Sequence, residues 1–232
     1  MNPLVITIDG PAAAGKSTTA RAVARHLGCL YLDSGAMYRA VALKATRAGL
    51  SVDDEPEVAE LARGTDVGFT GPLDDPSVVL DGVEIGDEIR TPQISERASR
   101  IAAYPAVRGR MAELQRAIAA RQALVAEGRD MGTVLFPAAT VKVFLDATVE
   151  ERARRRHREL AGRGLELALY EVRDEIERRD RRDRERALSP LRPAADAIVV
   201  DTTGMSVEDQ IEAVLKAVDS RSGRPGGRAE VG

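Results

Sequence analysis

Short runs of β-branched and aliphatic residues alternate along the chain with longer stretches whose apolar residues recur at spacings of three and four. The runs predict buried strands at residues 4–8, 30–32, 123–126, 141–145 and 197–200. The longer stretches predict helices at residues 17–27, 36–48, 107–121, 149–160, 169–186 and 207–218. Strands that alternate with helices are typical of a parallel sheet covered on both faces, so the sequence predicts an α/β fold.

One segment, residues 66–89, departs from this alternation. Its short apolar runs are separated by glycine, proline and aspartate, and Asp81 and Gly82 stand between two of them. An Asp-Gly pair supports the type I′ turn of a two-residue β-hairpin. The sequence therefore predicts a small antiparallel sheet inserted into the α/β core.

Length and composition are those of one globular domain. With 232 residues, 44% of them hydrophobic, the chain can bury a single sizeable core. We expect residues 1–219 to form this domain and residues 220–232 to be a disordered tail.

Cys29 is the only cysteine, which excludes an intrachain disulfide and a cluster of thiolates. There is no basic leader before an apolar core and no apolar run of about 18 residues, so we expect a cytoplasmic protein without a membrane span.

Charge is unevenly distributed. The net charge is −3, yet residues 151–186 contain 13 arginines against 10 acidic residues. A cationic segment in an acidic chain indicates a local anion site and not a nucleic-acid surface. Only 3% of the residues are aromatic, which leaves few platforms for stacking single-stranded nucleic acid.

A phosphate-binding loop with the pattern G-x-x-x-x-G-K-S/T joins the first predicted strand to the first predicted helix. This arrangement directs backbone N–H groups at one point, where the helix dipole favours an anion. We expect Lys16 to reach the β- and γ-phosphates and Ser17 to offer its hydroxyl to Mg²⁺. A chance match to a tight strand–helix turn is the alternative. The predicted triphosphate site comprises Gly10, Pro11, Ala12, Ala13, Ala14, Gly15, Lys16, Ser17 and Thr18.

Polar residues follow the predicted strands, at the sheet edge where ligands of parallel sheets gather. Ser34 and Arg39 come after the second strand. Ser34 is well placed to cap the N-terminus of a helix, and the Arg39 guanidinium could bind a phosphate. Arg129 and Asp130, flanked by glycines, follow the third strand. A capped helix and a surface ion pair are the alternative interpretations.

Two further clusters lie in the cationic segment. Arg179, Asp183 and Arg186 have helical spacings of four and three, so they share one helix face that can hold a ribose and phosphates. The second cluster can fold over a transferred phosphoryl group as a lid and comprises Arg152, Arg155, Arg156 and Arg158. A solvated, salt-bridged helix is the alternative for both clusters.

These pieces together resemble the bacterial cytidylate kinases of the nucleoside monophosphate kinase group, from Ile6 to about Val214. The most specific stretches are residues 7–11, 33–35 with 38–39, 88–91, 128–133 with 136–137, and 179–183 with 190–191. The insert adds to the resemblance, because this group has a small extra sheet in its monophosphate-binding region. The resemblance implies a P-loop three-layer αβα fold, with a monophosphate-binding region at about 34–106 and a short helical lid at about 150–168.

By that resemblance the reaction is transfer of the γ-phosphoryl group of ATP to CMP or dCMP, with Mg²⁺. The residues that resemble those holding the CMP phosphate are Ser34, Arg39 and Arg129. Those that resemble the readers of the cytosine edge are Ser99, Arg108 and Asp130. Sugar contacts are implied for Arg179 and Asp183. The implied catalytic residues are Lys16, Arg129, Arg186 (which reaches the phosphates) and the lid arginines Arg155 and Arg156. Ser17 stands where some relatives have glycine.

The chemistry agrees with these roles. Phosphoryl transfer needs alignment and charge neutralisation, and the acceptor phosphate is already ionised, so no general base is expected. Asp130 can accept from the N4 amino group of cytosine, where uracil presents an acceptor instead. Since an unpaired buried polar group costs about 1–3 kcal/mol, a preference for CMP over UMP follows.

Two alternatives remain at this point. A P-loop kinase for another small molecule would share the loop and lid but have a different acceptor pocket. A P-loop switch or nucleic-acid ATPase would call for an Asn-Lys-x-Asp base reader or a long basic surface, and the sequence has neither. Without heptad repeats we expect a monomer, whose partners are ATP and CMP or dCMP, with no nucleic acid and no membrane.

Overall fold

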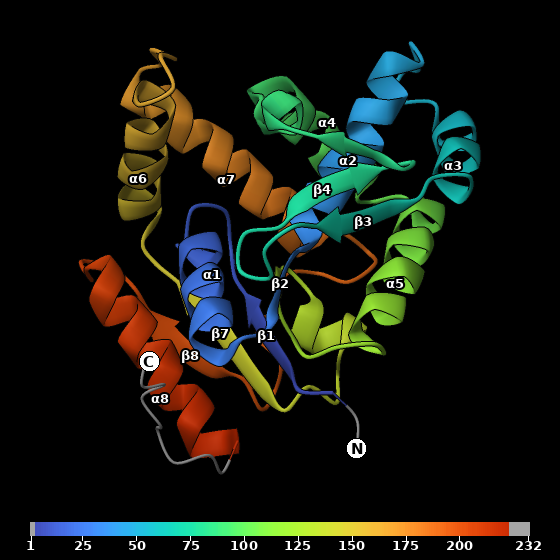
Figure 1. Ribbon diagram of the computed structural model, residues 1–232. Helices are drawn as coiled ribbons and strands as arrows, with labels where there is room; N and C mark the ends of the chain where they lie inside the picture. The colour runs from blue at the N-terminus through green and yellow to red at the C-terminus, as the bar shows by residue number, and fades with distance from the viewer. Residues whose placement is uncertain (1–2, 223–232) are drawn as a thin grey trace.

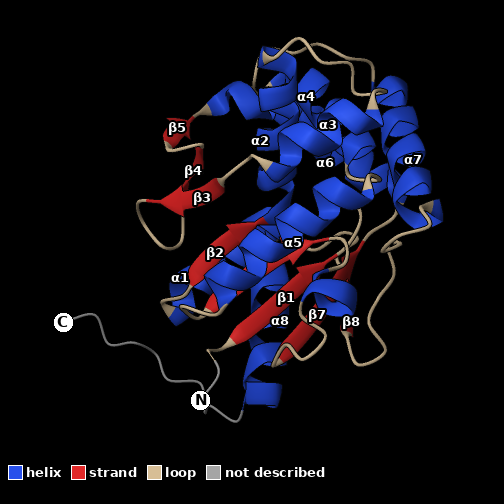
Figure 2. Cartoon of the chain, turned by 90° about the vertical axis from the view of Figure 1, so that its right-hand side faces the viewer, coloured by secondary structure: helices blue, strands red, loops and turns tan. Residues whose placement is uncertain are grey.

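A computed structural model describes residues 3–222 of the chain. At its centre is a parallel sheet in the order β2-β6-β1-β7-β8 (Figures 1 and 2). The strands are β1 (Val5–Asp9), β2 (Leu30–Asp33), β6 (Leu124–Gly128), β7 (Val141–Asp146) and β8 (Ile198–Asp201). Each begins and ends within two residues of a strand expected from the sequence, so the predicted parallel sheet is confirmed.

Helices cover both faces of this sheet, which makes the fold three-layered (Figure 2). One face is covered by α1 (Lys16–Leu27) and α8 (Val207–Ser222), the other by α2 (Ser34–Arg47) and α5 (Pro105–Ala119). Strand β6 shows why both layers are needed. Its Leu124 and Ala126 are buried in one apolar cluster and Val125 in the other. A strand that is apolar on both sides must be covered on both sides.

Two further helices, α6 (Val149–Ala161) and α7 (Leu169–Glu185), stand beyond the carboxyl ends of the strands (Figure 1). They pack on each other through an apolar cluster made of Ala153, Leu160, Val172 and Ile176. The expected lid, at about residues 150–168, therefore corresponds to α6 and the loop that follows it. Among residues 3–222, no helix combines the length and apolarity needed to cross a membrane.

The predicted antiparallel insert is confirmed. Its strands are β3 (Val67–Thr70), β4 (Ser77–Leu80) and β5 (Val83–Ile85), paired in that order. Asp81 and Gly82 join β4 to β5 with φ of 50° and 82°. Positive φ at both central residues is the geometry of the type I′ turn, as the Asp-Gly pair predicted.

Other elements differ from expectation. The sequence analysis did not identify the helices α3 (Glu55–Arg63) and α4 (Pro92–Ile101), the 3₁₀ turn η1 (Asp87–Arg90) or the π-helical turn η2 (Met131–Leu135). Both helices carry recognisable start signals, because Asp54 and Thr91 cap them and a proline follows within the first turn. The expected tail is wrong for residues 220–222, which continue α8, and its remainder, 223–232, lies outside the described residues.

Candidate active site

The predicted phosphate-binding loop connects β1 to α1 in a conformation that requires glycine. Gly10 has a φ of 152°, and a Cβ there would lie 2.1 Å from the carbonyl oxygen of Leu145. Gly15, with a φ of 90°, directly precedes α1. The Lys16 side chain folds back over the loop, with Nζ 2.6 Å from the Pro11 carbonyl oxygen. The loop thus surrounds the amine at a helix N-terminus, where backbone N–H groups favour a phosphate.

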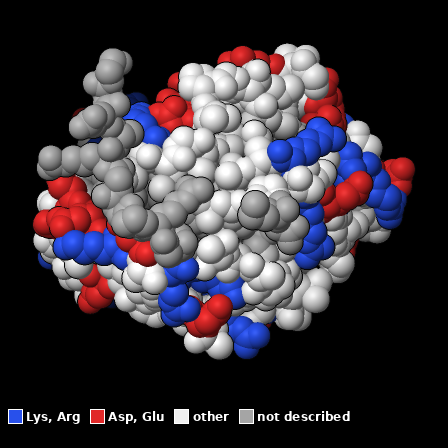
Figure 3. Space-filling model, turned by 60° about the horizontal axis from the view of Figure 1, so that its bottom comes forward, with Lys and Arg blue, Asp and Glu red and all other residues white. Residues whose placement is uncertain are grey.

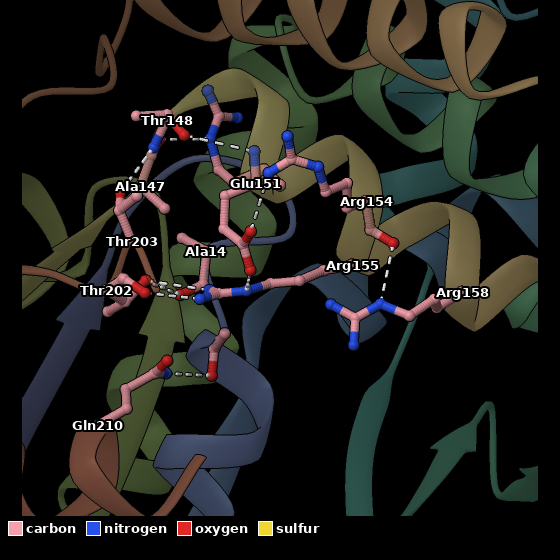
Figure 4. Close-up of polar contacts among 12 residues, drawn as sticks. Ala14, Ala147, Thr148, Glu151, Arg154, Arg155, Arg158, Thr202, Thr203 and Gln210 are labelled. Atoms are coloured by element: carbon pink, nitrogen blue, oxygen red, sulfur yellow. Dashed lines mark hydrogen bonds and ion pairs between the residues drawn. The ribbon is translucent and has the colours of Figure 1, made fainter. Parts of the chain in front are cut away.

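Polar side chains from the C-terminal part of the chain brace this loop (Figure 4). The Thr202 hydroxyl lies 3.3 Å from the Ala14 carbonyl oxygen, and Gln210 donates to the Gly15 carbonyl at 3.1 Å. Arg155 of α6 donates to the hydroxyl and carbonyl oxygens of Thr202 at 3.0 and 2.6 Å. Arg155, expected over the phosphoryl group, therefore joins α6 to the segment after β8.

A cleft of about 740 Å³ lies between the phosphate loop, α2, α4, α6 and α7. Twelve Lys and Arg against seven Asp and Glu residues line it. Burial, with the charges of Arg129 and Arg179, lowers the pKa of Lys16 to about 7. Burial and Arg129 also lower the pKa of Arg179 to about 10. On the opposite end of the molecule, charges of both signs are interspersed (Figure 3). The cleft is therefore suited to a polyanion that offsets its crowded positive charge.

Two residues expected at the acceptor phosphate lie in the first half of α2 and line the cleft. Ser34 donates from its hydroxyl to the Glu127 carbonyl at 2.6 Å, and Arg39 pairs with Asp33 at 2.8 Å. The N-cap of α2 is Asp33, whose carboxylate accepts from the Ala36 N–H at 2.8 Å. The expectation that Ser34 is the N-cap is therefore wrong, and its hydroxyl instead ties α2 to the end of β6.

Arg129, Arg179 and Asp183 form a group between α7 and the segment after β6. Arg129 Nε donates to the Asp183 carboxylate at 2.9 Å. Burial works to raise the pKa of Asp183, but the charges of Arg129, Arg179 and Arg186 outweigh it and lower the pKa. Arg179 lines the cleft, and its Nε is buried without a hydrogen-bond partner among the described residues. The group keeps one carboxylate ionised beside an arginine free to bind a ligand.

The expected base-reading residues meet in the same cleft, although they come from α4, α5 and the segment after β6. Arg108 and Asp130 form a buried ion pair. The Ser99 hydroxyl is buried and finds no hydrogen-bond partner within residues 3–222. Arg186, expected at the phosphates, lies 3.6 Å from Asp130 and donates from Nε to the Ser189 carbonyl at 2.5 Å. The cleft thus offers buried hydrogen-bond donors and one carboxylate acceptor, which suit the polar edge of a bound heterocyclic ring.

The four arginines expected to form a lid do not act alike. Arg155, Arg156 and Arg158 line the cleft. Arg152, however, is only 1% exposed. It donates to the Ala12 carbonyl at 3.2 Å and pairs with Asp180 at 2.6 Å. Its burial between the phosphate loop and α7 removes it from the lid group.

Glu127 is a candidate site residue that the sequence analysis left without a role. It ends β6 inside the cleft, and the Tyr31 hydroxyl donates to its carboxylate. Burial and the charge of Asp33 raise the pKa of Glu127, while Lys16 and a hydrogen bond from Ser17 lower it, and the net shift is upward. The signal in the sequence was a carboxylate at the end of a predicted strand. Its contact with Ser17 places two oxygen atoms that could bind a metal ion beside the phosphate loop.

The fold and the site define the chain as a P-loop kinase, because the loop follows the central strand and opens into a cationic cleft. A crystal structure of an uncharacterized protein from Eubacterium ventriosum has the same fold. The match has a TM-score of 0.50 and 11% identity, and covers 94% of this chain and 99% of that one.

Sequence comparison identifies the family. The cytidylate kinase family model matches residues 6–220. The chain is 48% identical to the cytidylate kinase of Desulfitobacterium hafniense, over 94% of this chain and 94% of that protein. It is 51% identical to the cytidylate kinase of Bordetella bronchiseptica, over 91% and 93%. This chain belongs to the cytidylate kinase family, and the resemblance noted from its motifs is confirmed.

Proposed function

We propose that this chain transfers the γ-phosphoryl group of ATP to CMP or dCMP, giving CDP or dCDP. The observation that carries the proposal is the group of Ser99, Arg108 and Asp130, which lines the same cleft as the phosphate loop and in which Arg108, Asp130 and the Ser99 hydroxyl are buried. Cytosine offers an N4 amino donor beside the N3 and O2 acceptors. Asp130 can accept from N4, while Arg108 and Ser99 can donate to the ring acceptors. Family membership supports the same acceptor.

The chain's cationic residues supply what phosphoryl transfer requires. Lys16 and the loop hold the donor phosphates, while Ser34, Arg39 and Arg129 hold the acceptor phosphate. Arg156 and Arg186 are proposed to neutralise charge on the transferred group, and Arg155 to support the loop through Thr202. With both substrates aligned and their charges offset, no general base is needed.

Mg²⁺ is the proposed cofactor, and the oxygen donors beside the phosphate loop fit it. Ser17 contributes a hydroxyl and Glu127 a carboxylate, and the two are in contact next to Lys16. Oxygen ligands of this kind, completed by substrate phosphates, are those Mg²⁺ prefers. When bound, the ion neutralises charge on the β- and γ-phosphates.

The proposed lid is α6 with the loop after it, closing over a monophosphate-binding region at about residues 34–106. Two contacts already join the α6–α7 pair to that region. Arg163 donates to the Arg90 carbonyl at 3.2 Å, and Arg182 pairs with Glu96 at 2.5 Å. The cytoplasmic location and monomeric state expected from the sequence stay predictions.

An acceptor panel tests the proposed function. Release of ADP from Mg·ATP is measured with CMP, dCMP, UMP and AMP offered separately. We expect fast turnover with CMP and dCMP and slow turnover with UMP and AMP, because only cytosine matches the buried donors and acceptor. Turnover with UMP equal to that with CMP would contradict the role of Asp130. A lack of turnover with all four acceptors would contradict the reaction itself.

Asp130→Asn tests the base reader directly. The amide keeps the size of the side chain but loses the charge that faces Arg108 and Arg186. It can also donate to the O4 oxygen of uracil. We expect the ratio of kcat/KM for CMP to that for UMP to fall about 10- to 100-fold, the equivalent of one buried hydrogen bond. A ratio as high as in the unaltered protein would refute the assignment.

A further inference from the structure

Asp9 ends β1 and directly precedes the phosphate loop, yet its carboxylate contacts a distant part of the chain. One oxygen accepts from the Met131 N–H and the other from the Gly132 N–H, both at 2.8 Å. These are the first two N–H groups of η2, the turn that follows Asp130. A carboxylate on the first N–H groups of a helical turn acts as a cap. Here the cap comes from a residue 122 positions away from Met131.

The turn that Asp9 caps is held closely against the sheet. A Cβ on Gly132 would lie 2.9 Å from the Thr7 hydroxyl oxygen. Asp9 itself is 5% exposed, and burial raises its pKa to about 6 although the two N–H groups work to lower it. A carboxylate buried in this way costs stability, and the pairing of β1 with β6 uses backbone groups alone. Forming the sheet therefore does not need this carboxylate, and its two hydrogen bonds to η2 point to another role.

We propose that Asp9 is a positioning residue for base recognition, which acts by holding η2 and does not touch substrate. By fixing the turn, it sets the place of the Asp130 carboxylate beside Arg108. Because the phosphate loop begins at Gly10, a single residue aligns the base-reading segment with the donor phosphate site. The inference rests on the proposed function, in which Asp130 reads cytosine.

Asp9→Asn is the test, because asparagine has the same size but can accept only one of the two hydrogen bonds. We expect the ratio of kcat/KM for CMP to that for UMP to fall about tenfold, the effect of one buried hydrogen bond. The loss should appear in the KM of the acceptor, while the KM for ATP changes by less than about threefold. Asp146→Asn is the matched control, since Asp146 ends the neighbouring strand β7 and accepts from its own Ala147 N–H at 2.9 Å.

Asp130→Asn in the same assay separates the possible outcomes. An unchanged ratio in Asp9→Asn beside a lowered ratio in Asp130→Asn overturns the positioning role and leaves the proposed function standing. An unchanged ratio in both variants overturns base reading by Asp130 and this inference with it. A lowered melting temperature with an unchanged ratio shows a purely structural role and also overturns the inference. If the asparagine variant does not fold by circular dichroism, Asp9→Ser, smaller and still an acceptor, carries the same expectation.

Discussion

Replacing Lys16 with methionine is expected to lower kcat on the order of 10³-fold, the loss typical of removing one preorganised charge-stabilising group. The amine lies 2.6 Å from the Pro11 carbonyl oxygen, inside the loop that receives the phosphates. Methionine keeps the length and apolar stem of the side chain, so the loop retains its packing. The missing charge is the one that stabilises negative charge as the phosphoryl group moves.

The pKa of Lys16 makes this prediction sharper. Burial together with Arg129 and Arg179 lowers it to about 7, so the amine is largely neutral at pH 8. Bound phosphates favour the ammonium form. ATP binding should therefore take up protons at pH 8 and fewer at pH 6, where Lys16 is already charged. Isothermal titration calorimetry in buffers of different ionisation enthalpy measures this uptake, which Lys16→Met should abolish.

The lowered pKa of Lys16 also makes the free energy of unfolding depend on pH. The folded pKa of about 7 is below the unfolded value of 10.5, so the unfolded chain binds more protons between these pH values. The contribution of Lys16 to the free energy of unfolding thus rises with pH over this range, and its full penalty is present below pH 7. At pH 6 and without added nucleotide, Lys16→Met should therefore melt at a higher temperature than the unaltered protein.

Lys44→Met provides the control for this substitution. Lys44 lies on α2 and pairs with Asp81 of the insert at 2.7 Å, outside the set of residues that line the cleft. Its kcat and proton uptake should match those of the unaltered protein. A Lys16→Met enzyme that keeps more than about a tenth of the original kcat would contradict charge stabilisation by the amine.

What the sequence could predict was local. The phosphate loop is recognisable because its chemistry needs adjacent residues: Gly10 cannot carry a Cβ near Leu145, and Gly15 needs a positive φ before Lys16. The strands were equally clear, since each contains a short run of β-branched or aliphatic residues. The hairpin turn at Asp81 followed from a two-residue preference alone.

The base-reading group could not be derived in this way. Ser99, Arg108 and Asp130 lie on different elements, and only the packing of α4 and α5 around the cleft brings them together. No spacing in the sequence encodes that contact, so their roles came from the resemblance. Helix α4 itself was missed although Ile94, Ala98 and Ile101, at spacings of four and three, form its buried face.

The charged run of α7 shows why pattern alone left two interpretations open. A solvated helix and a ligand-binding helix have the same composition there. In the structure Asp180 and Asp183 are buried, whereas the neighbouring Arg181 and Arg184 are exposed. Burial of a carboxylate depends on which arginines face it from other elements, and for Asp183 these include Arg129, far away in the sequence.

Arg152 pairs with one of these buried carboxylates. Of the arginines paired with buried carboxylates, it is the one whose loss we expect to destabilise the protein most. Its guanidinium is 1% exposed and joins three segments. It donates to the Ala147 carbonyl at 3.0 Å and to the Ala12 carbonyl of the phosphate loop at 3.2 Å, and it pairs with Asp180 of α7 at 2.6 Å. Replacing it with methionine leaves the Asp180 carboxylate buried without its partner.

Arg152→Met should therefore lower the free energy of unfolding by about 3–5 kcal/mol, the cost of breaking a buried ion pair from one side. Urea unfolding measures it, with Arg154→Met as the control on the same helix, because the Arg154 side chain is 61% exposed. Arg152→Met combined with Asp180→Asn should recover part of the loss, since the second change removes the uncompensated charge. A loss below about 1 kcal/mol in Arg152→Met would mean that water reaches Asp180 and screens it. In that case Arg152 would not be what fastens α6 and α7 to the phosphate loop.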